Sequence, residues 1–201
     1  MSVFFLSIYN LLLSILIIVV SIPALFISKR FRTEVSYHLL ERFAVGPALN
    51  KKLHGGKKVI WFHCASLGEV RAIEPILDKL KDDFLIALTT TAKSGREYAS
   101  KISGLALVSL FPLDIYPIAI KAFKRIDPDI FILIETELWA SVLYAAHRRG
   151  IKTAVLNARI SDKTYRIYRK ARFFWKYFIS AIDIVLARSK EDGRRFACFM
   201  P

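Results

Sequence analysis

The chain has 201 residues, of which 54% are hydrophobic, and it carries 31 Lys and Arg against 17 Asp and Glu. This length fits one packed domain with a short appendage, and the apolar content excludes a disordered protein. The net charge of +14 favours an anionic partner, namely nucleic acid, anionic lipid or a phosphorylated substrate. Cys64 and Cys198 lie in apolar sequence without metal-ligand spacing, so we expect free, buried thiols in a reducing compartment.

Residues 1–28 form an apolar segment that predicts a membrane-anchor helix. No charged residue occurs between positions 3 and 27. This stretch is long enough to span a membrane, because roughly 20 helical residues cross a bilayer. A signal peptide would need a basic start, but no Lys or Arg precedes Lys29. It would also need a small-x-small cleavage site, and none is found near Pro23. We expect a spanning helix, with a helix lying in the membrane surface as the alternative. Basic residues follow the apolar run, and by the positive-inside rule they place the rest of the chain on the cytoplasmic side. They are Lys29, Arg30 and Arg32.

Residues 29–56 predict a basic, polar connector with a short helix at 37–43, which Gly46 and Pro47 interrupt. From 57 to 201, short apolar runs alternate with amphipathic ones. This alternation indicates a parallel sheet covered on both faces, and the Rossmann-like doubly wound α/β fold is its default form. The predicted strands are 59–64, 84–89, 105–110, 130–134, 153–156 and 184–187. The predicted helices are 69–81, 94–101, 115–125 with Asp114 as its cap, 137–149, 164–180 and one opened by Ser189.

Ser66-Leu67-Gly68-Glu69 follows the first predicted strand, where doubly wound sheets bind their ligands. Ser66 followed three residues later by Glu69 matches a helix capping box. Alternatively, Gly68 lets a ligand approach the helix N-terminus, and Glu69 acts as a general base on an acceptor hydroxyl. The spacing alone favours the cap.

Glu135-Thr136-Glu137 follows the fourth predicted strand. Two carboxylates one residue apart can bind hydroxyl groups or raise each other's pKa. Thr136 as a helix cap, with Glu137 at the favourable end of the helix dipole, explains the pattern equally well. His63 has no second His or Cys at ligand spacing, so we expect a hydrogen-bonded histidine and no metal site.

The segment 163–178 is both basic and aromatic, a combination that suits an anionic membrane surface. A surface helix that packs its aromatics on the sheet and a single-stranded nucleic-acid site are the alternatives. With an apolar segment upstream, we favour membrane contact and expect no nucleic-acid partner. The residues assigned to this contact are Arg166, Arg169, Lys170 and Trp175.

Several ordered motifs resemble those of the transferases of 3-deoxy-D-manno-octulosonic acid (Kdo). The run from Trp61 to Val70 resembles the family signature W-h-H-x-x-S-h-G-E, in which h is apolar. The other motifs are Thr89-Thr90-Thr91 with Ser94-Gly95, Pro112-Leu113-Asp114, Glu135-Thr136-Glu137-Leu138-Trp139, Asn157-Ala158-Arg159-Ile160-Ser161 and the run from Arg188 to Phe196.

The resemblance implies a type B glycosyltransferase with two Rossmann-like domains, which transfers Kdo from CMP-Kdo to a lipid A precursor at the inner membrane without a metal or cofactor. The N-terminal domain would bind the acceptor, and the C-terminal domain would bind CMP-Kdo. Glu69 would be the general base that deprotonates the 6′-hydroxyl of the acceptor. Ser66, Gly68, Glu135 and Glu137 would bind substrate, and Arg159 and nearby lysines would be candidates to bind an anionic group such as a lipid phosphate.

Two departures from the family pattern bear on this expectation. Trp139-Ala140-Ser141 stands where the family has Trp-Pro-Asn, so the helix after it can begin differently. The chain also stops at Pro201, so we expect 57–201 to be an acceptor-binding domain without its CMP-Kdo-binding partner domain. Such a truncated chain would be inactive alone and would need a separate C-terminal domain chain. A non-catalytic, membrane-anchored binding module or relic is the alternative.

Overall fold

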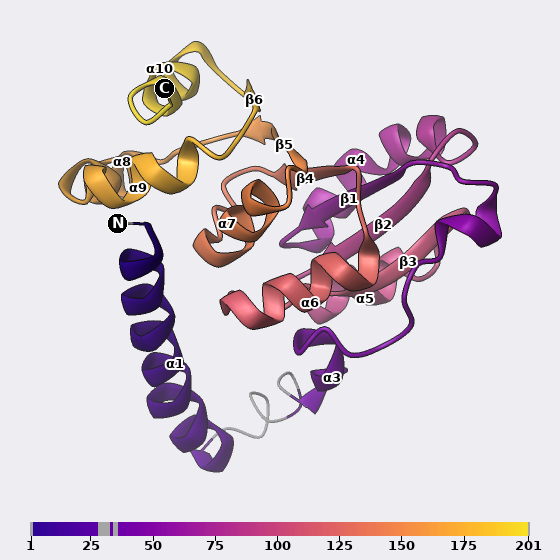
Figure 1. Cartoon of the computed structure of the whole chain (residues 1–201), viewed down its shortest axis with the longest axis horizontal. Helices are drawn as coiled ribbons and strands as arrows, with labels where there is room; N and C mark the ends of the chain where they lie inside the picture. Colours follow the sequence, from indigo (N-terminus) through magenta and orange to yellow (C-terminus); the bar gives the residue numbers. More distant parts are fainter. Residues whose placement is uncertain (1, 28–32, 34–35, 201) are drawn as a thin grey trace.

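The computed structural model describes residues 2–27, 33 and 36–200 and shows a six-stranded parallel sheet with helices on both faces (Figure 1). The strand order is β3-β2-β1-β4-β5-β6, the doubly wound order whose direction reverses between β1 and β4. The predicted Rossmann-like sheet is therefore confirmed. The strands are β1 Val59–Cys64, β2 Leu85–Thr90, β3 Leu105–Leu110, β4 Ile130–Ile134, β5 Lys152–Ala158 and β6 Ile184–Ala187.

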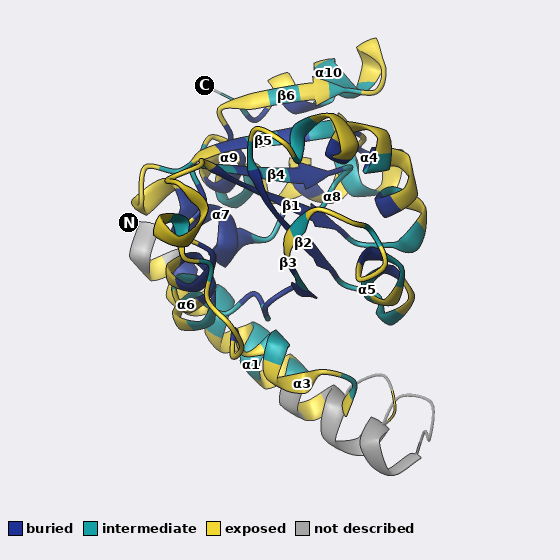
Figure 2. Cartoon of the chain, turned by 90° about the vertical axis from the view of Figure 1, so that its right-hand side faces the viewer, coloured by how far each residue is buried: buried dark blue, intermediate teal, exposed yellow. Residues whose placement is uncertain are grey.

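The sheet separates two apolar layers because side chains alternate between its faces along each strand. On one face, Trp61 of β1 packs against Phe123 at 4.9 Å and Phe131 at 4.6 Å between ring centroids. On the other face, Phe62 joins a cluster with Val70. Figure 2 shows the central strands buried and the edge strand β6 largely exposed.

The helices divide between these two faces. Those after β1 and β2 cover the Phe62 face, and those after β3 and β4 cover the Trp61 face. The bounds of the helices that follow β1 to β4 are α4 Leu67–Leu80, α5 Lys93–Ala99, α6 Tyr116–Ile126 and α7 Ala140–Arg148. The remaining helices of the domain are α8 Asp162–Lys170, α9 Arg172–Ile179 and α10 Lys190–Ala197.

The helix predicted at 164–180 is wrong, because the chain forms two helices, α8 and α9, that meet at Ala171. Ala171 leaves helical geometry, with φ −105° and ψ 35°. The break brings Tyr168 and Trp175 together at 4.1 Å between ring centroids, and both pack on the core. Burial of these aromatics therefore overrides the continuous helical pattern of the sequence.

The cap predicted for α6 is also wrong, and of the two alternatives for Glu135-Thr136-Glu137 the structure does not support Thr136 as the cap of α7. Asp114 does not cap α6, whose N-cap is Ile115. Its carboxylate instead accepts a hydrogen bond from the Val142 N–H at 2.9 Å, across the fold in the first turn of α7. Residues 135–136 form a turn and 137–139 have no regular structure, so α7 starts later than predicted, with Trp139 at the N-cap position.

The connector fastens to the sheet through Glu41, which lies in the short helix α3, Leu39–Arg42. Its carboxylate accepts from the Leu110 N–H at 2.7 Å and from the Arg96 guanidinium at 2.7 Å. Burial opposes ionisation, but these two donors lower the pKa of Glu41. The predicted short helix is confirmed, and a 3₁₀ turn, η1 Lys51–His54, then leads towards β1.

The N-terminal segment forms the predicted helix, α1 Ser2–Ile27. It docks on the domain through polar groups: the Tyr9 hydroxyl donates to Asp114 at 2.6 Å, and Asn10 Oδ1 accepts from the Tyr116 N–H at 2.8 Å. Among the described residues, no helix is long and apolar enough to cross a membrane. The predicted spanning helix is thus not found in this part of the chain, and a role for α1 as a membrane anchor stays a prediction.

Both cysteines are free, as predicted. Cys64 is buried in β1, but the predicted burial of Cys198 is wrong. Cys198 follows the last residue of α10 and is exposed, with its sulfur 3.4 Å from the Tyr165 hydroxyl. Its apolar neighbours Phe196 and Phe199 take the buried positions instead.

Phe123→Ala tests whether the Trp61 layer holds the sheet together. Phe123 is fully buried, so its truncation leaves a cavity and should lower the free energy of unfolding by about 3–5 kcal/mol. The exposed control Ile167→Ala should change it by less than about 0.5 kcal/mol. Urea denaturation followed by circular dichroism measures both, and equal losses would contradict the assigned core.

Candidate functional site

The candidate site lies where two loops meet at the reversal point of the sheet. β1 and β4 are parallel neighbours, with His63 opposite Leu133 at their carboxyl ends. The segments that follow these strands, which carry Glu69 and Glu137, therefore leave the same edge side by side. This edge is where doubly wound folds place their ligands, so the predicted residues fall in the expected region.

Ser66 and Glu69 form a reciprocal cap at the start of α4. The Ser66 hydroxyl oxygen accepts from the Glu69 N–H at 3.3 Å and donates to Glu69 Oε1 at 2.9 Å. Glu69 Oε2 accepts from the Ala65 N–H at 2.7 Å. The capping prediction is confirmed, and the contacts hold the half-buried carboxylate in one orientation.

The electrostatics of Glu69 favour a second role beside the cap. Burial raises its pKa, and the charges of Glu135 and Glu137 raise it further, against the lowering contacts of Ala65 and Ser66. A carboxylate whose pKa is raised is a stronger base near neutral pH. Capping and proton abstraction are therefore compatible at this position.

Glu137 is oriented by the indole of Trp139. Its Oε2 atom accepts from Trp139 Nε1 at 3.0 Å and lies 3.8 Å from His63 Nε2. The role of Trp139 was not predicted from the sequence, where its signal is an indole two residues after a carboxylate. The Trp139 contact thus holds the Glu137 carboxylate in one orientation at the edge of the sheet.

His63 is fully buried and stacks on Phe111 at 3.6 Å between ring centroids. Its Nδ1 lies 3.1 Å from the Thr89 carbonyl, which can only accept, so Nδ1 carries the proton. Burial lowers the pKa of His63, although Glu137 opposes this effect. The predicted hydrogen-bonded histidine is confirmed. In the part of the chain that the structure describes, no three His, Cys, Asp or Glu side chains gather as a metal site.

Glu135 has a left-handed backbone with φ +61°, an uncommon conformation for a residue other than glycine. Its N–H donates to the Leu156 carbonyl at 2.9 Å, which fixes the turn after β4. Such strain accumulates at functional sites, and here it turns the chain abruptly between β4 and Glu137.

Gly68 and Gly95 lie near the site, and they differ in what an added Cβ atom would contact. A Cβ on Gly68 would meet only Ser66 Oγ, at 3.8 Å, so packing within the chain does not require glycine there. The space above Gly68 is open to a ligand at the N-terminus of α4. A Cβ on Gly95 would lie 3.2 Å from Thr90 Cβ, so Gly95 permits the close packing of α5.

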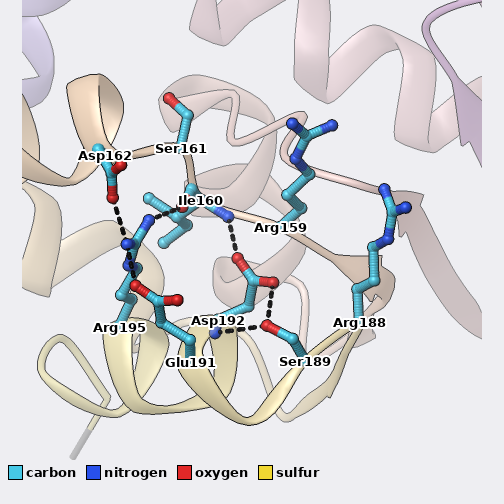
Figure 3. A pocket seen from close by; sticks show the side chains of 9 residues that line it. All are labelled: Arg159, Ile160, Ser161, Asp162, Arg188, Ser189, Glu191, Asp192 and Arg195. Atoms are coloured by element: carbon cyan, nitrogen blue, oxygen red, sulfur yellow. Dashed lines mark hydrogen bonds and ion pairs between the residues drawn. The ribbon is translucent and has the colours of Figure 1, made fainter.

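The remaining predicted residues lie apart from the carboxylates. Arg159 lines a separate pocket at the ends of β5 and β6 (Figure 3). Trp175 is half-buried against Tyr168 rather than free on the surface. The three basic residues of α8 that were predicted to contact a membrane are exposed, and they are Arg166, Arg169 and Lys170. The three that follow α1, Lys29, Arg30 and Arg32, lie outside the described residues.

A family model described as 3-deoxy-D-manno-octulosonic-acid transferase (kdotransferase) matches residues 37–200. The chain belongs to the Kdo transferase family. A 3-deoxy-D-manno-octulosonic acid transferase of Chlamydia pneumoniae is 29% identical over 185 residues, 89% of this chain and 41% of that protein. One of Bordetella pertussis is 32% identical over 144 residues, 68% of this chain and 33% of that protein. The chain thus spans less than half the length of these relatives.

A solved structure agrees with the fold of this Kdo transferase family member. A crystal structure from Listeria monocytogenes, assigned to the UDP-N-acetylglucosamine 2-epimerases, matches 70% of this chain and 41% of that chain with a TM-score of 0.50. At 13% identity this likeness shows the Rossmann-like fold alone. The family match, in contrast, covers every site residue from Ser66 to Arg159.

Glu69→Gln tests the electrostatics of the candidate site. Because the pKa of Glu69 is raised in the folded state, ionisation costs stability as pH rises through that pKa. The glutamine side chain of the variant does not ionise. The free energy of unfolding of the variant minus that of the parent chain should therefore increase between pH 3 and pH 7. Urea titrations at several pH values measure this difference. The exposed control Glu97→Gln should show a smaller trend, and a trend of opposite sign for Glu69→Gln would contradict the assignment.

Proposed function

We propose that this chain is the acceptor-binding part of a glycosyltransferase that transfers Kdo from CMP-Kdo to a lipid A precursor in lipopolysaccharide biosynthesis. The observation that carries the proposal is the placement of Glu69 at the β1–β4 edge, where burial raises its pKa and the nearby charges of Glu135 and Glu137 raise it further. Membership in the Kdo transferase family supports the same chemistry.

Glu69 acts as general base in this proposal. It takes the proton of the acceptor 6′-hydroxyl as that oxygen bonds to the anomeric carbon of Kdo, and the bond from that carbon to the phosphate of CMP breaks. CMP leaves with the bonding electron pair, and the proton stays on Glu69 Oε. The Ala65 and Ser66 contacts aim the carboxylate, and the raised pKa makes it an effective base.

The other carboxylates position the acceptor. Glu137, held by Trp139, accepts a hydrogen bond from a sugar hydroxyl, and Glu135 does so from the adjoining turn. Ser66 and Gly68 present the open N-terminus of α4 to the same sugar.

CMP-Kdo is proposed to bind a second domain, supplied by a separate chain or by a continuation of this one. The relatives are more than twice as long as the segment that this chain matches. A two-domain site would remain half-built with this domain alone, so we propose that the chain does not transfer Kdo by itself.

The exposed face of α1 supports contact with the cytoplasmic face of the inner membrane. Large apolar side chains recur along this face at helical spacing, whereas Leu6 and the polar groups of Tyr9 and Asn10 face the domain. The exposed basic side chains of α8 would add attraction to an anionic surface. The apolar stripe consists of Phe4, Ile8, Leu11, Leu12, Ile15, Leu16 and Val19.

Transfer of Kdo to a tetraacyl disaccharide phosphate tests the proposed enzyme. We expect product when the chain is combined with the second part of the Chlamydia pneumoniae relative, and none with either part alone. Glu69→Gln should lower kcat about 10²–10⁴-fold because the base is lost, and the exposed control Glu97→Gln should not.

Two results would contradict the transferase. An active Glu69→Gln combination would remove the general base from the mechanism. Saturable acceptor binding without product in any combination would favour the non-catalytic binding module, for which the capping contacts of Glu69 already provide a structural role.

Vesicle binding tests the α1 stripe. The double variant Leu12→Glu with Leu16→Glu places two charges in the stripe and should lower the bound fraction on phosphatidylglycerol vesicles at least tenfold, since charged groups resist burial in lipid. Leu40→Glu with Leu53→Glu is a matched control at exposed positions outside α1. Co-sedimentation measures both, and equal losses would contradict a specific contact by α1.

A further inference from the structure

A second pocket of about 530 Å³ lies at the carboxyl ends of β5 and β6, between the starts of α8 and α10 (Figure 3). Ala158 and Ala187 are paired in the β5–β6 register, so the residues that follow them leave the sheet as neighbours. The Arg188 N–H donates to the Ala158 carbonyl at 3.0 Å and fixes this arrangement. Arg159 and Arg188 therefore stand side by side, because adjacent strands lie about 5 Å apart.

The three acidic residues of the pocket are already engaged with other groups. Asp192 accepts from the Ile160 N–H at 2.9 Å and from the Ser189 hydroxyl. Asp162 and Glu191 both accept from the Arg195 guanidinium, which also donates to the Ile160 carbonyl. The acids thus form a closed network around Arg195 and the N-cap of α10.

Arg159 and Arg188 stay outside that network. Neither guanidinium makes a hydrogen bond or ion pair with any other described residue, and both side chains are exposed. Figure 3 shows both extending to the same side of the pocket, away from Arg195. The Ser189 hydroxyl is the main cause that lowers the pKa of Asp192, and Arg159 contributes only as a nearby charge.

Two adjacent guanidinium groups that no carboxylate pairs with directly repel each other, and an anion between them removes that repulsion. Each guanidinium presents paired N–H donors that match phosphate oxygens, and the N-terminus of α10 adds a favourable dipole. We propose that Arg159 and Arg188 together bind a phosphate monoester carried by a larger ligand. The pocket is large enough for such a group and part of the sugar that bears it.

This inference deepens the proposed function and rests on it for one point only, that the phosphate belongs to the glycolipid acceptor. The family resemblance pointed to Arg159 and nearby lysines as candidates to bind an anionic group. The structure adds Arg188, which comes from the next strand and doubles the positive charge at that point.

Binding of two phosphate monoesters to the full chain tests the site and separates the sources. Glucose 1-phosphate, followed by calorimetry, represents a soluble ester, and vesicles containing phosphatidic acid represent a lipid ester. We expect Arg159→Gln or Arg188→Gln to weaken binding about tenfold, as for one charge-assisted hydrogen bond. Arg188→Lys should keep part of the affinity, and the exposed control Arg148→Gln on α7 should keep all of it.

The outcomes are distinct. Arginine-dependent binding of glucose 1-phosphate supports the site with a soluble ligand, and dependence seen only with phosphatidic acid supports it with a lipid. Equal affinity of all variants for both probes, or an equal loss with Arg148→Gln, overturns it. If the arginine variants bind both probes as the parent chain does while Kdo transfer persists, only this inference is contradicted. If phosphate binds but no transfer occurs, only the proposed function is lost.

Discussion

The parallel pairing of β1 with β4 is the constraint on which the candidate site depends. The helices that follow these two strands pack on opposite faces, α4 against Phe62 and α7 against the Trp61 layer. The loops between strand and helix must therefore diverge, and they leave an opening at the sheet edge. Any slip of this pair would separate Glu69 from Glu137, so burial of the aromatic layer also holds the carboxylates together.

The carboxylates show a compromise between stability and reactivity. Glu69, Glu135 and Glu137 repel each other, and partial burial of Glu69 adds to the cost of its charge. The hydrogen bonds from Ala65 and Ser66 offset part of this cost, but the pKa of Glu69 remains raised. A domain stabilised mainly by its apolar layers can tolerate such a group, and a base with a raised pKa is the result.

Asp114 connects the N-terminal helix to this site. Burial raises its pKa to about 6, against the hydrogen bonds from Tyr9 and Val142 that lower it. One oxygen caps α7 and the other holds α1, so the helix that begins just after Glu137 shares an anchor point with the segment proposed to contact the membrane. A lipid-bound substrate would need this fixed relation between membrane contact and carboxylates.

The sequence by itself determined the local features of this protein. Apolar alternation predicted the six strands, and the spacing of Ser66 and Glu69 predicted the cap, because both depend on neighbours within a few residues. The family motifs pointed to Glu69 and Glu137, since these residues lie in short, ordered runs. The predicted fold and the cap were confirmed in the structure.

Only the tertiary structure decided the contacts between distant segments. Asp114 follows the pattern of a cap for α6 yet caps α7, because the fold brings the Val142 N–H to it. The break at Ala171 results from burying aromatics on a core that no local pattern encodes. Arg159 and Arg188 become neighbours through strand register alone, since pairing between strands depends on the packing of the whole sheet.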